Sequence, residues 1–278
     1  RGASIAAIKK LSGEDYQTHL LRNFLKLPNQ NDRQCAVNDM TEFGEIQLLP
    51  LILKTPVSPF FRLRAIDIIW PKHLDKVNNL HLFYLLDNLI KDHPNHLDLL
   101  NGDTKKLDEK ILSSYLFSTD FLTCYIALKQ LIKKEPNEIW LALGSQLERS
   151  KSDYGALYFL MLLFRYVRGW DDIALKKIKE LTILCLGKQW PEFIKFKPVA
   201  ILTLMELFPE IAVIQAPEWL DESKTPYWVS RYAALLAIED FLGKDKSTNL
   251  GESILKSSLD KHPFVQRKAI NIQSRFLI

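Results

Sequence analysis

The chain has 278 residues, of which 37 are Lys or Arg and 33 are Asp or Glu, so its formal net charge is +4. Hydrophobic residues make up 47% of the chain, enough to fill a core, which excludes a largely disordered protein. The longest uninterrupted apolar run, Ala156–Phe164, is too short to span a bilayer. The mild charge does not require nucleic acid as a partner. Three widely spaced cysteines indicate a reducing compartment, so we expect a cytoplasmic protein without disulfides.

The elements expected along the chain are helices. Glycine is scarce, with 10 in the whole chain, while Leu, Ile and Lys are abundant. Within Phe60–Trp70, the apolar residues Phe61, Ala65 and Ile68 fall on one face of a helix. The segment Tyr227–Phe241 has the same spacing, and we find no convincing run that alternates as a strand does. The sequence therefore predicts an all-α fold.

A short motif recurs along the chain at intervals close to 30 residues. Trp228–Ala233 (WVSRYA) and Phe264–Ala269 (FVQRKA) both have the pattern aromatic-Val-x-Arg-x-Ala and both follow a proline. Phe60–Ala65 is a looser copy. The alanines at the centres of all copies are Ala6, Ala36, Ala65, Ala127, Ala156, Ala200, Ala233 and Ala269. Most are 29 to 36 residues apart, and gaps of 62 and 44 residues indicate a degenerate repeat near 93–120 and an insertion near 165–195.

Repeats of this length predict stacked helix pairs. A pair of about 30 residues cannot bury its apolar face alone, so neighbouring pairs must cover one another. We therefore predict a single α-solenoid of HEAT-like helical repeats over residues 1–278, with a groove lined by the second helix of each pair as the expected binding surface. The chain begins inside a second-helix pattern, RGASIAAIKKL, so we expect it to be truncated at the N-terminus.

Common catalytic and metal-binding motifs are not found. The chain has neither GxGxxG, GxxxxGK(S/T) nor GxSxG. His93 and His96 have a His-x-x-His spacing with Asp92 and Asp98 nearby, but Pro94 places them in a loop. We interpret this segment as a solvated loop and expect no metal site.

Arginines and aromatic residues recur at the repeat positions, and each has two interpretations. The arginines either form a ladder of salt bridges between repeats or face the groove and clamp anionic groups. The aromatic residues either fill the core or offer flat stacking surfaces. The segment Arg165–Asp172 combines cations, aromatics and carboxylates, which suits a ligand-facing loop. Cys35 and Cys124 stand close to repeat alanines, so we expect them to be buried.

Three segments resemble a known family. Thr225–Phe241 and Asp260–Phe276 resemble the closing repeats of the E/F-type phycobilin lyases, and Asn31–Ile69 resembles their earlier repeats. These HEAT-repeat proteins of cyanobacteria attach open-chain tetrapyrroles, the bilins, to cysteines of phycobiliproteins through thioether bonds, and some members also isomerise the bilin. The resemblance covers about half the chain. Leu80–Asn137 does not match clearly, and the Asn-His-Cys motif of one isomerising branch is absent.

The resemblance implies an enzyme, a phycobilin lyase of the phycoerythrin type, with phycoerythrobilin as its expected substrate and no separate cofactor. The attacking thiol would come from the acceptor protein. Bilin propionates require cations, the pyrrole N–H groups require a carboxylate, and the conjugated plane requires aromatic walls. On this basis the predicted catalytic residues are Asp67 and Asp240. The residues predicted to bind the bilin are Arg64, Trp70, Tyr125, Tyr158, Arg165, Trp228, Arg231 and Tyr232.

The partners implied are the phycobilin chromophore, an apo-phycobiliprotein subunit and a second lyase subunit, with no nucleic acid and no membrane span. Two other functions suit the same fold. A protein-binding scaffold or chaperone would bind apo-phycobiliprotein but no pigment. A HEAT-like DNA glycosylase would need a strongly basic groove, against which a net charge of +4 argues.

Overall fold

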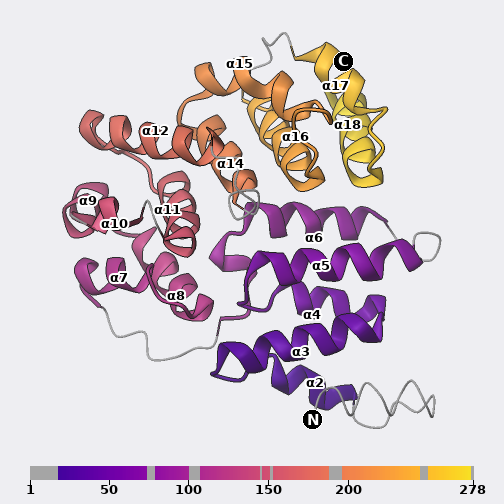
Figure 1. Ribbon diagram of the computed structural model, residues 1–278, viewed down its shortest axis with the longest axis horizontal. Coiled ribbons are helices and arrows are strands. Elements are labelled where there is room, and N and C mark those ends of the chain that lie inside the picture. Colours follow the sequence, from indigo (N-terminus) through magenta and orange to yellow (C-terminus); the bar gives the residue numbers. More distant parts are fainter. Residues whose placement is uncertain are drawn as a thin grey trace. The chain divides into compact units, whose positions relative to one another are not determined.

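The computed structural model describes the chain in seven stretches. These are residues 18–73, 79–99, 107–144, 146–150, 153–187, 196–244 and 250–276. Within them the regular elements are helices alone, which confirms the all-α fold (Figure 1). None of the helices in these stretches combines the length and apolarity that a membrane crossing requires. The repeat copy centred on Ala6 lies outside the described residues.

The chain divides into two compact units, Arg1–Leu131 and Ile132–Ile278. The α-helices described in the first unit are α2 (Thr18–Phe24), α3 (Gln30–Phe43), α4 (Leu49–Leu53), α5 (Pro59–Ile69), α6 (Asn79–Lys91), α7 (Glu109–Tyr115) and α8 (Phe121–Leu131). Short 3-10 turns lie at η1 (Ile46–Leu48), η2 (Trp70–His73) and η3 (Pro94–His96). In this unit α3 packs on α5, with α2 and α4 as their partners, and α6 packs on both α4 and α5.

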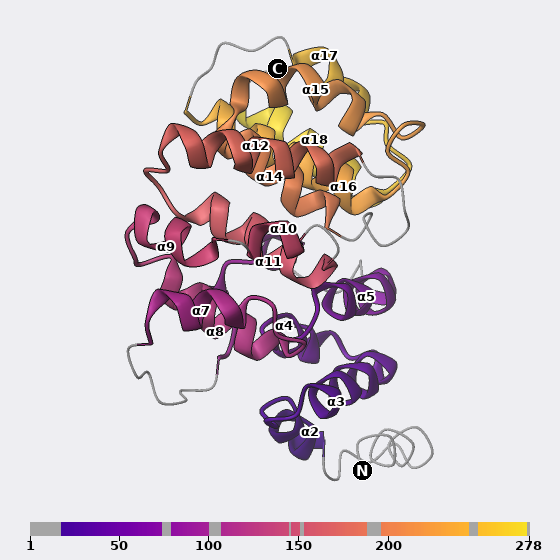
Figure 2. The same ribbon diagram turned by 60° about the vertical axis from the view of Figure 1, so that its left-hand side comes forward.

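The second unit repeats this pattern more regularly. Its α-helices within the described residues are α9 (Pro136–Leu143), α10 (Gln146–Ser150), α11 (Tyr154–Tyr166), α12 (Asp172–Gly187), α14 (Lys197–Leu207), α15 (Pro209–Leu220), α16 (Trp228–Leu242), α17 (Gly251–Ser257) and α18 (Pro263–Phe276). Helices α11, α14, α16 and α18 pack in a row, and α12, α15 and α17 pair with α14, α16 and α18 (Figures 1 and 2). This row of helix pairs confirms the HEAT-like repeats. That one solenoid runs through both units, with the degenerate repeat and the insertion, stays a prediction.

Local sequence explains where several helices begin and end. The Asn29 side chain accepts hydrogen bonds from two backbone N–H groups at the start of α3, and Gly44 ends that helix in the left-handed conformation, with φ of 74°. Pro59 and Pro263 are the first residues of α5 and α18, where a missing N–H costs nothing. Pro59 and Pro263 therefore mark helix starts, whereas Pro226 lies two residues before α16.

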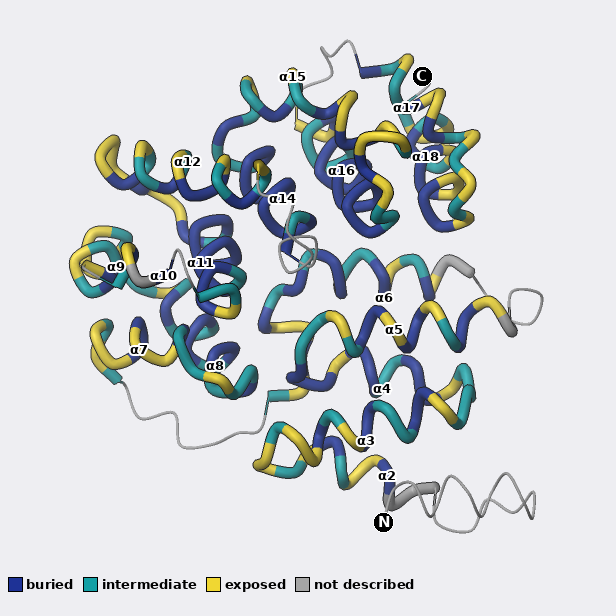
Figure 3. Tube along the Cα trace, viewed as in Figure 1, coloured by how far each residue is buried: buried dark blue, intermediate teal, exposed yellow. Residues whose placement is uncertain are grey.

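The repeat alanines lie where neighbouring helices meet. All of them within the described residues are 2% exposed or less, from Ala36 to Ala269. Helices α14 and α16 are buried along most of their length, whereas α12 and α17 alternate between buried and exposed residues (Figure 3). A helix that is apolar all round must be covered on all sides, which places α14 and α16 at the core of the second unit.

Buried arginines link the repeats, which confirms the ladder interpretation for three of them. The pairs are Arg33 with Asp120, Arg62 with Asp92, and Arg231 with Asp260. Arg62 and Arg231 reach a carboxylate 30 and 29 residues along the chain, about one repeat. Arg33 reaches one 87 residues away and so joins α3 to the start of α8. By contrast, Arg64 and Arg267 are exposed.

Candidate functional site

Three aromatic residues predicted to stack on a bilin lie inside the protein. Trp70, Tyr125 and Tyr232 are 1% exposed or less. Trp70 packs edge to face on Phe83 of α6, with 5.1 Å between ring centroids. The Lys268 ammonium lies 5.7 Å from the centroid of the Tyr232 ring. The motif that placed these residues is a packing motif, so their rings face neighbouring helices rather than a groove. In this structure the three rings pack in the core, and their contact with a bilin stays a prediction.

Arg231 also has a structural role, and its contact with the bilin stays a prediction. Its side chain donates to both carboxylate oxygens of Asp260 at 2.7 and 2.9 Å. It donates further to the carbonyls of Thr225 and Pro226. Because Arg231 is 2% exposed, it cannot reach a ligand outside without giving up these bonds.

Trp228 and Tyr158 are half-buried, and their rings rest on neighbouring side chains. The Trp228 ring stacks on the imidazole of His262, with 4.2 Å between centroids and 6° between planes. Burial lowers the pKa of His262 to about 4, so the imidazole is neutral at physiological pH. Tyr158 meets Phe159 edge to face. Trp228 therefore already has an aromatic neighbour on one face.

One exposed face of α5 brings two predicted residues together. Phe60, Arg64 and Asp67 follow at intervals of four and three residues, which aligns them along one side of the helix. All three are exposed. Surrounding protein atoms still desolvate the Asp67 carboxyl, and this raises its pKa to about 6. The face thus offers an aromatic ring, a guanidinium and a carboxyl that can hold a proton near neutral pH.

Two further predicted residues, Arg165 and Asp240, line one small hollow in the second unit. Its volume is about 20 Å³, enough for roughly one water molecule. Beside it, Glu206 binds Arg168 and Lys244, so an ion-pair bridge connects α14 to both neighbours. Burial acts to raise the Glu206 pKa, but the bonds from these two cations outweigh it and the pKa is lowered. The hollow brings the predicted pair together without room for a tetrapyrrole.

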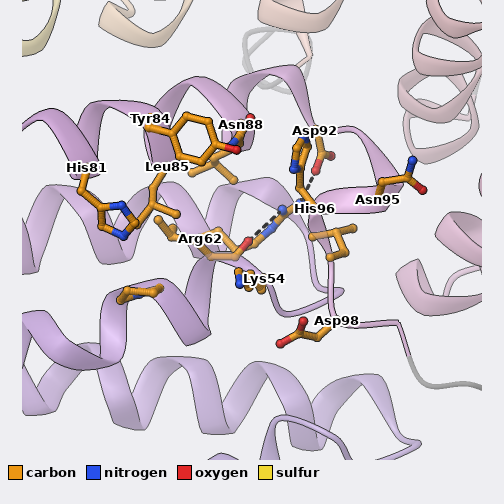
Figure 4. Close-up of a pocket in the computed structure, with 14 residues that line it drawn as sticks. Lys54, Arg62, His81, Tyr84, Leu85, Asn88, Asp92, Asn95, His96 and Asp98 are labelled. Atoms are coloured by element: carbon orange, nitrogen blue, oxygen red, sulfur yellow. Dashed lines mark hydrogen bonds and ion pairs between the residues drawn. The ribbon is translucent and has the colours of Figure 1, made fainter.

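A larger cavity, which the sequence did not predict, lies in the first unit. It has a volume of about 260 Å³ and lies among α4, α5, α6 and η3. Figure 4 shows Arg62 reaching from α5 to Asp92 at one end, while His81, Tyr84 and Asn88 come from α6. The Asp98 N–H donates to the Lys54 carbonyl at 2.8 Å and ties the loop after η3 to α4.

The floor of this cavity is a closed polar cluster. Arg62 donates to Asp92 at 2.9 Å and to the Tyr125 hydroxyl at 2.6 Å, and that hydroxyl donates to the other Asp92 oxygen. Burial and the Asp92 charge raise the Tyr125 pKa well above its usual value, although Arg62 opposes them. Asp92 is buried and has a φ of 48°, a left-handed conformation that is uncommon outside glycine.

Exposed polar side chains form the rim of the cavity. Lys54, His81, His96 and Asp98 are all exposed, and the Tyr84 ring is 58% exposed. The segment around His96 is a loop, as expected, because the His93 side chain accepts from the Asn95 N–H and starts a 3-10 turn. Within the described residues no group of His, Cys, Asp and Glu could hold a metal ion. The polar run from 92 to 98 was the only sequence signal for this site.

Of the two cysteine predictions, one is confirmed and the other is wrong. Cys124 is buried, with its Sγ 3.3 Å from the Ser118 carbonyl oxygen, which confirms the expected packing role. Cys35 is exposed, so the expectation that it is buried was wrong. It directly precedes the buried Ala36, and one residue turns a helix by about 100°, which carries Cys35 to the outer face of α3.

Comparison with known proteins finds a similarity to a protein named for bilin biosynthesis. No protein-family model matches it. Bilin biosynthesis protein CpeY of Synechococcus sp. (strain WH8020) is 28% identical over 270 residues, which are 97% of this chain and 64% of that protein. The chain is thus similar to a bilin biosynthesis protein over almost its whole length. The resemblance carried by the repeats is thereby confirmed and extends through the middle of the chain.

A second relative comes from another cyanobacterial strain. Uncharacterized phycocyanin operon protein Y of Pseudanabaena tenuis (strain PCC 7409) is 28% identical over 242 residues, 86% of this chain and 56% of that protein. The chain therefore spans about three-fifths of the curated relatives it matches.

Proposed function

We propose that this chain is the bilin-handling part of a phycobilin lyase. It binds an open-chain tetrapyrrole, phycoerythrobilin, and joins it by a thioether bond to a cysteine of a phycobiliprotein subunit, with a second lyase subunit as a further partner. The observation that carries the proposal is the similarity to a bilin biosynthesis protein over 97% of the chain.

The proposed reaction is an addition that needs no oxidant or reductant. The S–H of the acceptor cysteine adds across the double bond of the A-ring substituent. A carbon–sulfur bond forms, and the thiol proton is balanced by a proton delivered to the tetrapyrrole. The protein's part is to fix the bilin conformation and to supply that proton. This division explains why no activated nucleophile is needed in the chain itself.

The exposed face of α5 supplies the groups this chemistry needs. Asp67, with its pKa raised to about 6, is the proposed proton donor, because a general acid is most effective when its pKa is close to the working pH. Arg64, about one helical turn away, is placed to bind a propionate. Phe60 offers an apolar surface for the pigment plane. Asp240, the other predicted catalytic residue, provides the comparison in the second unit.

The test begins with titration of the purified chain with phycoerythrobilin, followed by absorbance and fluorescence. Binding should sharpen and red-shift the pigment band. Attachment to an apo-phycoerythrin subunit is then followed by mass spectrometry. Asp67→Asn should slow attachment about 100-fold with little change in bilin affinity, since it removes a general acid. Arg64→Met should instead weaken bilin binding about tenfold.

Asp240→Asn makes the same chemical change at the other predicted catalytic residue, which is half-buried. Asp32→Asn, at an exposed position of α3, is the matched control and should leave the rate of attachment unchanged. Attachment that slows equally in Asp67→Asn and Asp32→Asn contradicts the assignment to Asp67. A folded chain that binds apo-phycoerythrin subunits without any change in the bilin spectrum contradicts the lyase proposal and supports a protein-binding scaffold.

A further inference from the structure

The cavity of the first unit faces away from the surface proposed for the bilin. Arg62 lines the cavity, and Arg64 lies on the exposed face of α5. Two residues along an α-helix correspond to a rotation of about 200°, so these side chains leave the helix on nearly opposite sides. The cavity is therefore a separate site, with its own set of polar groups.

The floor of the cavity cannot accept a cation easily. Both carboxylate oxygens of Asp92 already accept hydrogen bonds, one from Arg62 and one from Tyr125. The charges of Arg62 and Asp92 compensate each other, and the hydrogen bonds among Arg62, Asp92 and Tyr125 hold the end of α6 against α5 and α8. Asp92 is kept there in an uncommon left-handed conformation, and backbone strain of this kind concentrates at functional sites.

Among the described residues, the rim carries one cation and several hydrogen-bond donors, set against one carboxylate. Lys54 has no ion-pair partner within the described part of the chain, and the imidazoles of His81 and His96 lie on the same cavity. The amides of Asn88 and Asn95 add further donors, against the exposed carboxylate of Asp98. Between these polar groups the walls are aliphatic. The apolar lining consists of Pro50, Leu53, Leu85, Leu89 and Leu97. A ligand that matches both the polar rim and the aliphatic walls carries one negative group on an apolar body.

We propose that this cavity binds a carboxylate on a short apolar stem. Its volume of about 260 Å³ lies just below the usual range for drug-sized ligands of about 300–1,000 Å³, so it suits a small acid or the end of a larger one. The carboxylate is bound by Lys54 with help from His81 and His96, and the stem lies on the leucines. The same chemistry is available from a free small acid or from a propionate arm of a tetrapyrrole.

The probe for this site is 3-phenylpropionate, compared with its uncharged analogue 3-phenylpropanamide by isothermal titration calorimetry on the full chain. The acid should bind at least tenfold more tightly than the amide, since one charge-assisted hydrogen bond accounts for about that factor. Lys54→Met should weaken binding of the acid about tenfold and leave binding of the amide unchanged. Lys110→Met, on an exposed position of α7 outside the cavity, is the matched control and should change neither.

A second variant, Asn88→Trp, places a large ring at the half-buried edge of the cavity and should weaken both probes. Equal binding of acid and amide, or an unchanged preference in Lys54→Met, overturns the proposal. Phycoerythrobilin that displaces the acid identifies a propionate arm as the source, while lack of competition identifies a free acid. The comparison of the acid with the amide uses no bilin. Its failure can therefore be distinguished from a failure of the lyase proposal.

Discussion

At the scale of single residues, Asp67 combines an exposed side chain with a carboxyl pKa of about 6. The folded protein holds this proton more tightly than the unfolded chain, in which the pKa is near the ordinary 3.8. The charged form therefore destabilises the fold, and the stability of the wild-type protein falls as pH rises from about 4 to 6. Perturbed pKa values cluster at functional sites, which agrees with a proton donor.

Asp67→Asn should stabilise the protein by about 1 kcal/mol at about pH 8, because it removes the partly desolvated charge; solvent screening of the exposed side chain keeps the effect this small. Toward pH 4 the difference should vanish, since wild-type Asp67 is then protonated. Urea unfolding at both pH values measures this. A variant that is less stable than wild type at about pH 8 would mean that the carboxylate has an attractive partner instead.

At the scale of elements, the arginine ladder explains how consecutive helix pairs stay in register. Arg231 of α16 reaches Asp260, just before α18, and the Asp260 carboxylate also accepts from the His262 N–H. Arg267 occupies the matching place in the motif of α18 but is exposed. The same residue in the same motif thus has a structural role in one repeat and lies on the surface in the next.

Arg231→Met should cost about 3 kcal/mol of unfolding free energy, because it leaves the buried Asp260 charge without its partner. Arg267→Met should change stability by less than about 0.5 kcal/mol, as is usual for exposed positions. Chemical denaturation of the two variants gives the comparison. Bilin affinity per folded molecule should be the same in both, and a specific loss of affinity in Arg231→Met would restore the predicted contact with the bilin.

At the scale of the whole molecule, the charge distribution argues against a nucleic-acid function. The net charge is only +4, and several cations are already paired inside the units. Examples are Arg33, Arg62, Arg231 and Lys268, each of which binds an Asp or Glu. A duplex-binding groove needs many free cations directed at phosphates.

We therefore expect no measurable binding to a 20-base-pair duplex at about 150 mM salt, when followed by fluorescence anisotropy. Bilin affinity should change less than about threefold between 50 and 200 mM salt, since few charges contribute. Duplex binding that weakens steeply over this salt range, as phosphate contacts do, would favour the glycosylase alternative.

The sequence by itself determined the helices and the repeat interval, and it carries the similarity to a bilin biosynthesis protein. The helices and the interval follow from spacing along the chain, which a 3.6-residue helical period converts directly into a buried face. It also offered both interpretations of the arginines. It did not decide between them, because a motif shows which residues recur but not which side chains of neighbouring helices they contact.

Only the tertiary structure decided which side of each helix is covered. It placed Trp70, Tyr125 and Tyr232 inside, and left Arg64 and Asp67 on an exposed face. It also formed the cavity of the first unit from α4, α5, α6 and η3, whose residues no single period connects. The reason is physical: burial and desolvation depend on the neighbours that packing brings close, and these come from segments tens of residues apart.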